Sequence, residues 1–300
     1  MKVSTRSASN IDGETMLVRA DDTGISRVIL HPGGWKHREE AFTKILLSEI
    51  KEGMCCLDVG ANLGLHTLSM AKRVGEHGRV ISIEPDPSNV EVLRANARSW
   101  SFGNRIEVIH GAVSDSDGGV EFYRAAASNL GSLSPSKHST GEKVVVPAWT
   151  IESLAEQHHF WPHFIKMDIE GAEVQAFAGL LPLIESHAPG SCKLLVELHP
   201  QLFGAGGSER FAATLRRLVE VGFRFKYVVS AGVPIPDKFR ERGYSPDPSF
   251  DPWQPGFTRR IYSNVSSEDA IDFCAWPHAQ TMPGGKISPK IARSFLLARE

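Results

Sequence analysis

The sequence lacks any long run of apolar residues. Its first twenty residues, MKVSTRSASNIDGETMLVRA, do not contain the apolar stretch that a secretory signal places after its basic start. No later window is apolar enough for a membrane span. We therefore expect no membrane insertion and a cytoplasmic location.

Cysteine and net charge are also scarce. The four cysteines show no C-x-x-C spacing, and three of them lie in apolar, strand-like runs, so we predict that all four are reduced thiols. The 33 Lys and Arg residues nearly balance the 35 Asp and Glu residues, which leaves a formal charge of -2. This balance gives no electrostatic reason to expect nucleic acid or an anionic membrane as the partner. A small molecule is the predicted partner.

Strand-like and helix-like patterns alternate along most of the chain. Strand-like runs occupy 54–59, 79–84 and 105–110, with helix-like runs at 65–74 and 88–100 between them. The alternation resumes with strands at 163–168, 192–198, 223–229 and 294–299 and helices at 172–184 and 208–221. This order predicts an α/β fold, a Rossmann-like αβα sandwich with a mostly parallel sheet.

Three regions depart from this alternation. ETMLVRA and SRVILHP, around a turn at 21–24, predict an N-terminal hairpin, and a helix that ends at Gly53 follows it. Residues 120–147 predict a hairpin insertion at the sheet edge. Residues 231–290 are rich in Pro and Gly and predict a lid-like insertion. We expect a single domain over 1–300, divided into 1–52 (hairpin and helix), 53–230 (core), 231–290 (insertion) and 291–300 (last strand).

A glycine-containing loop follows the first core strand. It runs from Asp58 through Gly60 and Asn62 to Gly64 and opens a helix, as a turn beneath a bound nucleoside does. Glu84 ends the next strand, where its carboxylate can accept hydrogen bonds from both hydroxyls of a ribose. Together these features indicate an adenosine-containing cofactor. Taken singly, Asp58 is equally explained as a loop-ordering acid and Glu84 as a surface acid before a turn.

The loop separates two classes of cofactor. A dinucleotide fingerprint needs glycine at positions 62 and 65, where this chain has Asn62 and Leu65. S-adenosylmethionine has no phosphate and does not require them, so we favour it over NAD. Thr67, in the first turn of the helix, is a candidate for the methionine carboxylate because the N-terminal end of a helix attracts anions.

The motifs DVGANLG, IEPDPSNVEVLRANA, GAVSD, IKMDIEGAE and VELHP, in this order, resemble the FkbM family of S-adenosylmethionine-dependent methyltransferases. The resemblance covers about residues 35–230 and the last strand. It implies a seven-stranded sheet with a reversed last strand and O-methylation of a hydroxyl on a sugar, glycolipid or secondary metabolite. By position, the resemblance assigns the following residues to the cofactor: Asp58, Gly60, Ala61, Asn62 and Gly64 to the donor loop, Glu84 and Pro85 to the ribose side, and Ala112 and Val113 to the adenine. Asn129–Ser132 also resembles a family feature, without an assigned role.

Methyl transfer to an alcohol requires removal of the acceptor's proton. Asp168 and Glu170 follow one core strand and His199 follows the next, so all three should lie at the crevice beside the Gly60 loop. His199 is the preferred general base, because imidazole titrates near neutral pH. Asp168 is a candidate both for the donor and for catalysis, and Glu170 is a further catalytic candidate.

Three alternatives stay open at this point. Asp168, Glu170 and Glu173 raise the question of Mg²⁺, but a helix N-terminus also favours such acids, so no metal site is predicted. The acceptor could instead be an amine, or the protein could bind the nucleoside without catalysis. Aromatic and basic residues of the insertion could contact a glycoside or only pack the insertion; they are Trp253, Phe257, Arg259, Arg260 and Trp276.

Overall fold

The computed structural model describes residues 3–11, 13–31, 40–186, 192–232, 238–250, 259–278, 280–281, 287–288 and 290–299. No helix within these ranges is long and apolar enough to cross a membrane. All four cysteines carry free thiols, as predicted.

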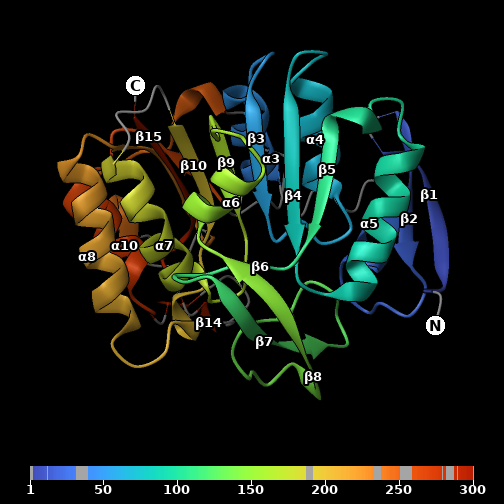
Figure 1. The fold of residues 1–300 in the computed structure, drawn as a ribbon. Coiled ribbons are helices and arrows are strands. Elements are labelled where there is room, and N and C mark those ends of the chain that lie inside the picture. Colours follow the sequence, from blue (N-terminus) through green and yellow to red (C-terminus); the bar gives the residue numbers. More distant parts are fainter. Residues whose placement is uncertain are drawn as a thin grey trace.

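An eight-stranded sheet forms the centre of the molecule (Figure 1). Its strands, in spatial order, are β12 (Ile261–Tyr262), β11 (Arg224–Ser230), β15 (Ala292–Arg299), β10 (Cys192–Glu197), β9 (Phe164–Met167), β3 (Cys55–Val59), β4 (Arg79–Glu84) and β5 (Ile106–His110). Strands β10, β9, β3, β4 and β5 pair in parallel, whereas β15 pairs antiparallel with both β10 and β11. The seven predicted strands with a reversed last strand are therefore present, and the insertion adds β12 at the edge.

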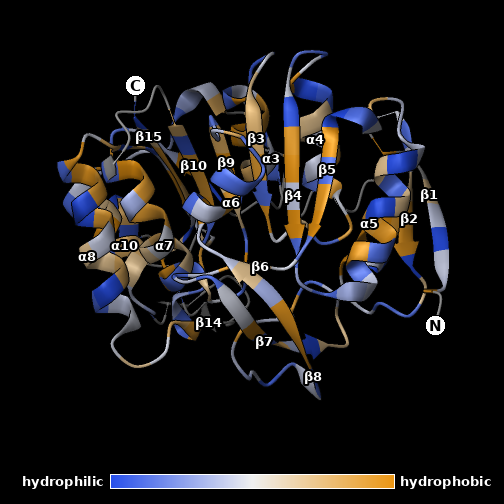
Figure 2. Ribbon diagram, in the orientation of Figure 1, coloured by the Kyte–Doolittle hydropathy of each residue, from blue (hydrophilic) through white to orange (hydrophobic). Residues whose placement is uncertain are grey.

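Helices cover both faces of this sheet. One face carries α3 (Glu40–Glu49), α4 (Leu65–Arg73) and α5 (Pro87–Ser99); the other carries α6 (Ile151–Gln157), α7 (Glu173–Ser186), α8 (Gly207–Glu220) and α10 (Ser267–Ala275). Alternate side chains of a strand point to opposite faces, so Leu57 joins the core under α7 and Cys56 the core under α4. Burial on both faces explains why the central strands are mostly apolar, as the orange colour over most of β4 shows (Figure 2). Short 3₁₀ turns occur at η1 (Gly103–Arg105), η2 (Pro200–Leu202) and η3 (Pro248–Phe250).

The N-terminal hairpin differs from the prediction. It pairs β1 (Thr5–Ile11) with β2 (Glu14–Arg19), while the expected second arm forms α1 (Ile25–Leu30). Assigning SRVILHP to a strand was therefore wrong. The Asp22 carboxylate accepts hydrogen bonds from the backbone N–H groups of Gly24 and Ser26 at 2.8 and 2.7 Å, and so satisfies donors at the start of the helix. These local bonds outweigh the strand preference of the apolar residues that follow.

The second hairpin forms a separate sheet instead of extending the edge of the central one. It comprises β6 (Ala112–Val113), β7 (Gly118–Ala125) and β8 (Ser139–Trp149), in the order β6-β8-β7. Because β6 follows β5 almost directly and pairs in parallel with β8, the hairpin is held beyond the carboxyl ends of the central strands (Figure 1). This position places it beside the crevice.

The described part of the insertion completes a helix layer. It contains α9 (Lys238–Glu241), β12, α10, β13 (Gln280–Thr281) and β14 (Ile287–Ser288). Phe239 stacks on Tyr262 with ring centroids 4.1 Å apart and also contacts Phe273, so these aromatic side chains form core. Trp276 is partly buried against the same core. Trp253 and Phe257 lie outside the described residues, and the lid stays a prediction.

Candidate active site

The donor loop connects β3 to α4 through residues in left-handed conformation. Gly60, Asn62 and Gly64 have φ angles of 75°, 53° and 95°. A Cβ atom at Gly60 would lie 2.1 Å from the backbone oxygen of Asp168, and one at Gly64 would lie 2.5 Å from Leu93. Glycine is therefore required at both positions, where the loop crosses β9 and where α4 meets α5.

Two predicted cofactor residues lie beneath this loop instead of facing a cavity. Asp58 and Thr67 have no exposed surface, and the Thr67 hydroxyl donates to Asp58 Oδ2 at 2.7 Å. Lys166 Nζ lies 3.1 Å from Asp58 Oδ1 and donates to the Gly60 carbonyl at 2.9 Å. These internal contacts support the loop, and direct contact of Asp58 and Thr67 with the donor stays a prediction. Lys166 lies on β9, a central strand of the sheet.

Glu84 is held at the end of β4 by three donors. Asn62 N donates to Oε2 at 2.8 Å, and Asp86 N and Asn89 Nδ2 donate to Oε1 at 2.9 and 3.1 Å. The side chain is 4% exposed, and burial raises the pKa of Glu84 to about 7. Its hydrogen-bonding role couples the end of β4 to the donor loop.

A cavity lies between this carboxyl and the small sheet, with about 600 Å³ of empty space when the solvent at its mouth is included. Predicted residues that line it are Gly60, Asn62, Glu84, Pro85, Ala112, Val113, Asp168 and Glu170. Ala61 lines a neighbouring second cavity, and Gly64 acts through packing of the helix. The structure thus brings most of the predicted donor residues to one space, although they come from four separate strand ends.

One wall of this cavity was missed as a binding element. Residues 128–133 contribute five of its lining residues: Ser128, Asn129, Gly131, Ser132 and Leu133. Ser128 donates to Asp22 through its backbone N–H at 2.8 Å and through its hydroxyl at 2.9 Å, and Asn62 Nδ2 donates to the Ser128 carbonyl at 2.9 Å. The resemblance of Asn129–Ser132 to a family feature was the available signal. Nothing local in the sequence indicates the contribution of Asp22.

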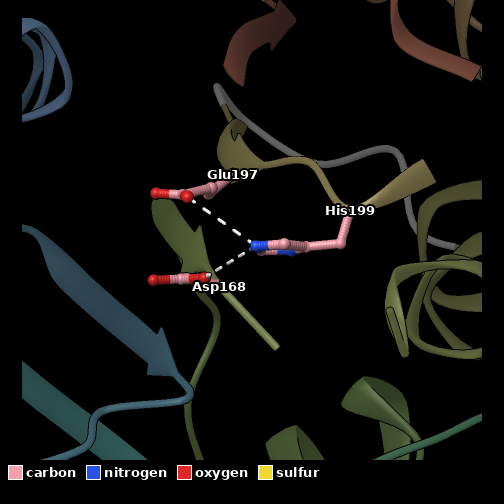
Figure 3. Close-up of side chains that lie close together, drawn as sticks. All are labelled: Asp168, Glu197 and His199. Carbon is pink, nitrogen blue, oxygen red and sulfur yellow. Dashed lines mark ion pairs between the residues drawn. The ribbon is translucent and has the colours of Figure 1, made fainter. Parts of the chain in front are cut away.

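The predicted catalytic residues do meet at the adjoining strand ends. Asp168 follows β9, and Glu197 and His199 lie at the end of β10, so that both carboxylates extend toward the imidazole (Figure 3). His199 Nε2 lies 3.5 Å from Glu170, 3.7 Å from Glu197 and 3.9 Å from Asp168. His199 Nδ1 lies 2.7 Å from Glu173, which has no exposed surface.

These carboxylates set the charge of the imidazole. Burial opposes protonation, but the charge and hydrogen bond of Glu173 raise the pKa of His199 to about 9. The raised pKa favours the protonated imidazole while the site holds no ion, so it does not favour His199 as the general base, and that assignment stays a prediction. Burial raises the pKa of Glu170, with Asp168 and Glu197 adding to the effect. The pKa of Glu197 is lowered, because Arg293 and Lys290 outweigh its burial.

The second cavity joins the first and has about 1780 Å³ of empty space when the solvent at its mouth is included. Gly60, Asn62, Asn129, Asp168 and Glu170 line both. Near His199 the second cavity is lined mostly by polar or charged side chains, which include His66, Lys166, Glu197, His199, Gln201 and Arg293. Along α1 and the start of α4 its lining is apolar and includes Ile25, Ile29 and Leu65. Two molecules bound in the two cavities would therefore meet where the cavities join, beside Asp168 and Glu170.

Comparison with known proteins identifies the family of this chain. The methyltransferase FkbM domain matches residues 58–225, more than half of the chain. The chain is 26% identical over 149 residues to the hexuronic acid methyltransferase AglP of Haloferax volcanii. This match covers 49% of this chain and 59% of that protein. It is 43% identical over 61 residues to a tRNA1(Val) (adenine(37)-N6)-methyltransferase of Porphyromonas gingivalis, covering 20% and 24% of the two chains. In both cases the match spans less than two thirds of the curated relative's length.

Among solved structures, the methyltransferase FkbM of Methylobacillus flagellatus is 18% identical, with a TM-score of 0.35 over 57% of this chain and 51% of that chain. The family match itself covers the donor loop, Glu84 and the whole cluster around His199. The chain therefore belongs to the FkbM family of S-adenosylmethionine-dependent methyltransferases.

Proposed function

We propose that this protein transfers the methyl group of S-adenosylmethionine to a hydroxyl of a sugar or of a sugar-containing acceptor. The observation that carries the proposal is the junction of two cavities at Asp168 and Glu170. A group-transfer enzyme has to bring two substrates together at one point and exclude water from it. The match to a hexuronic acid methyltransferase supports a sugar as the acceptor.

The first cavity is the proposed donor site. The Glu84 carboxylate faces it from the end of β4, in position to accept hydrogen bonds from ribose hydroxyls, and Ala112 and Val113 provide an apolar surface for adenine. The methionine part then extends past Gly60 and Asn62 toward Asp168. This orientation directs the methyl group at the second cavity.

The second cavity is the proposed acceptor site. Its polar and charged side chains suit a molecule rich in hydroxyl groups, which needs hydrogen-bonding partners once it leaves water. The acceptor oxygen attacks the methyl carbon, and the carbon–sulfur bond breaks with its electron pair going to sulfur. Glu170 lines both cavities and is the proposed recipient of the acceptor's proton. His199, held by Glu173, keeps the carboxylates in place.

Binding and turnover test the proposal separately. Calorimetric titration with S-adenosylhomocysteine should show micromolar binding that Glu84→Ala weakens by about 1 to 3 kcal/mol, the cost of losing buried polar partners. Glu209→Gln, an exposed acid on α8, is the matched control and should bind like the wild type. Absence of binding by the folded wild type would refute the donor site.

Radiolabelled methyl transfer to a panel of hexuronic acids, neutral hexosides and amines then tests the acceptor. Labelling of a sugar supports the proposal. Labelling confined to amines would replace it with N-methylation, and binding of S-adenosylhomocysteine without transfer to any acceptor would favour a nucleoside-binding protein without catalysis.

A further inference from the structure

Asp168, Glu197 and His199 each offer one ligand atom, and these atoms all lie within 4.8 Å of one another (Figure 3). We propose that the three side chains bind a divalent metal ion at the junction of the two cavities. Imidazole nitrogen and carboxylate oxygen together suit first-row divalent ions such as Mn²⁺. Binding of the ion at Nε2 would release the proton that this nitrogen otherwise carries to solvent. The catalytic role of the ion rests on the proposed function, whereas its binding to these three side chains does not.

The spacing of the ligand atoms fits such an ion. Ligands about 2.1 Å from an octahedral ion are separated by about 3.0 Å when adjacent and about 4.2 Å when opposite. His199 Nε2 lies 3.7 Å from Glu197 and 3.9 Å from Asp168, between these two values. Small side-chain rotations would therefore complete the coordination without movement of β9 or β10.

The orientation of His199 is the second, independent observation. Its Nδ1 is 2.7 Å from the fully buried carboxylate of Glu173, which turns Nε2 toward Asp168 and Glu197. A histidine that binds metal commonly has its other ring nitrogen fixed by a carboxylate in this way, because the contact sets both the tautomer and the direction of the ring. The arrangement is therefore a built ligand set and more than a group of surface acids.

The site is also accessible. The Asp168 side chain is 31% exposed, whereas those of Glu197 and His199 are 8% and 6% exposed. Arg293 Nη2 lies 2.6 Å from Glu197 and fixes that carboxylate. An ion held by three protein ligands at the cavity junction would keep its remaining positions open to water or to the acceptor.

At the reacting centre, the ion would bind the acceptor hydroxyl and make it more acidic. The hydroxyl proton would pass to the Glu170 carboxylate as the oxygen–methyl bond forms and the methyl–sulfur bond breaks, with the electron pair remaining on sulfur. The metal ion undergoes no redox change in this step.

Electron paramagnetic resonance of Mn²⁺ tests binding directly, since the sharp signal of the free ion is lost on binding. The full chain, freed of metal with a chelator, should bind one equivalent of Mn²⁺ saturably. Asp168→Asn and His199→Ala should each weaken this binding at least tenfold. Asp272→Asn, in a surface acid cluster on α10 that pairs with Arg242, is the matched control and should leave it unchanged.

Saturable binding that Asp168→Asn does not weaken, or no saturable binding at all, overturns the inference. Asp168→Asn changes a partly exposed side chain by one atom, so it keeps the test decisive should His199→Ala fail to fold, and thermal melting checks both variants. S-adenosylhomocysteine titrated into the same metal-free protein separates the two proposals. If it binds and Mn²⁺ does not, only the metal site fails; if S-adenosylhomocysteine does not bind, the proposed function fails whatever the result with Mn²⁺.

Discussion

The affinity for S-adenosylhomocysteine should depend on pH through Glu84. Burial raises the pKa of this carboxyl to about 7 in the unliganded protein. Ribose hydroxyls donate hydrogen bonds to a carboxylate, so the ionised form binds the nucleoside more tightly and binding releases the proton. If only the ionised carboxylate binds the ribose tightly, the Kd rises about tenfold, or about 1.4 kcal/mol, for each pH unit below the pKa. We therefore expect the Kd to be about tenfold higher at about pH 6 than at about pH 8.

Stability of the unliganded protein should change in the opposite direction. Because the folded-state pKa of Glu84 lies above its ordinary value of 4.5, its contribution to stability is fully present below about pH 4.5 and is lost as the pH rises through about 7. The upper limit of this contribution is about 3 kcal/mol, because the pKa rises from 4.5 to about 7. As the pH rises through about 7, ionisation of Glu84 should therefore strengthen ligand binding and lower the stability of the unliganded protein.

Calorimetry across this pH range, on the wild type and on Glu84→Gln, provides the assay. The variant cannot ionise at this position, so its Kd should be higher than that of the wild type and nearly independent of pH. Equal wild-type affinities at about pH 6 and about pH 8, or an unchanged slope in Glu84→Gln, would show that Glu84 does not contact the ribose as an anion.

Three further variants test how the site is supported. Gly60→Ala places a Cβ 2.1 Å from a backbone oxygen at φ 75°, so melting should show a loss of at least about 1–3 kcal/mol, and a wild-type melting temperature would contradict the strain. Lys166→Met leaves Asp58 as a buried unpaired charge and should cost about 3–5 kcal/mol in denaturant unfolding; a neutral effect would mean that the pair does not stabilise the loop. Asp22→Ala removes the acceptor for Ser128, so S-adenosylhomocysteine should bind less tightly and stability should fall by about 1–3 kcal/mol, whereas unaltered binding would show that the wall stands without it.

Local sequence patterns were sufficient for the central sheet and the donor loop. Strands buried on both faces are mostly apolar runs, and each of the seven predicted runs forms a strand. Gly60 and Glu84 could be placed together because ligands bind at the carboxyl ends of adjacent parallel strands, and both residues directly follow or end such strands. The same rule brought Asp168 and His199 to one crevice before any contact was known.

Only the tertiary structure decided how these residues act. Asp58 lies near the end of a strand as predicted, yet Thr67 and Lys166 contact its oxygens. The first turn of α4 brings Thr67 beneath the loop, and Lys166 comes from β9, which is far from the loop in sequence. The pKa of His199 is raised because Glu173, a buried acid on the preceding helix α7, contacts its ring. The cavity wall depends on a contact between residues 106 positions apart. Periodicity and motif spacing determine which element a residue belongs to, whereas charge state and contacts depend on the neighbours that long-range packing brings to it.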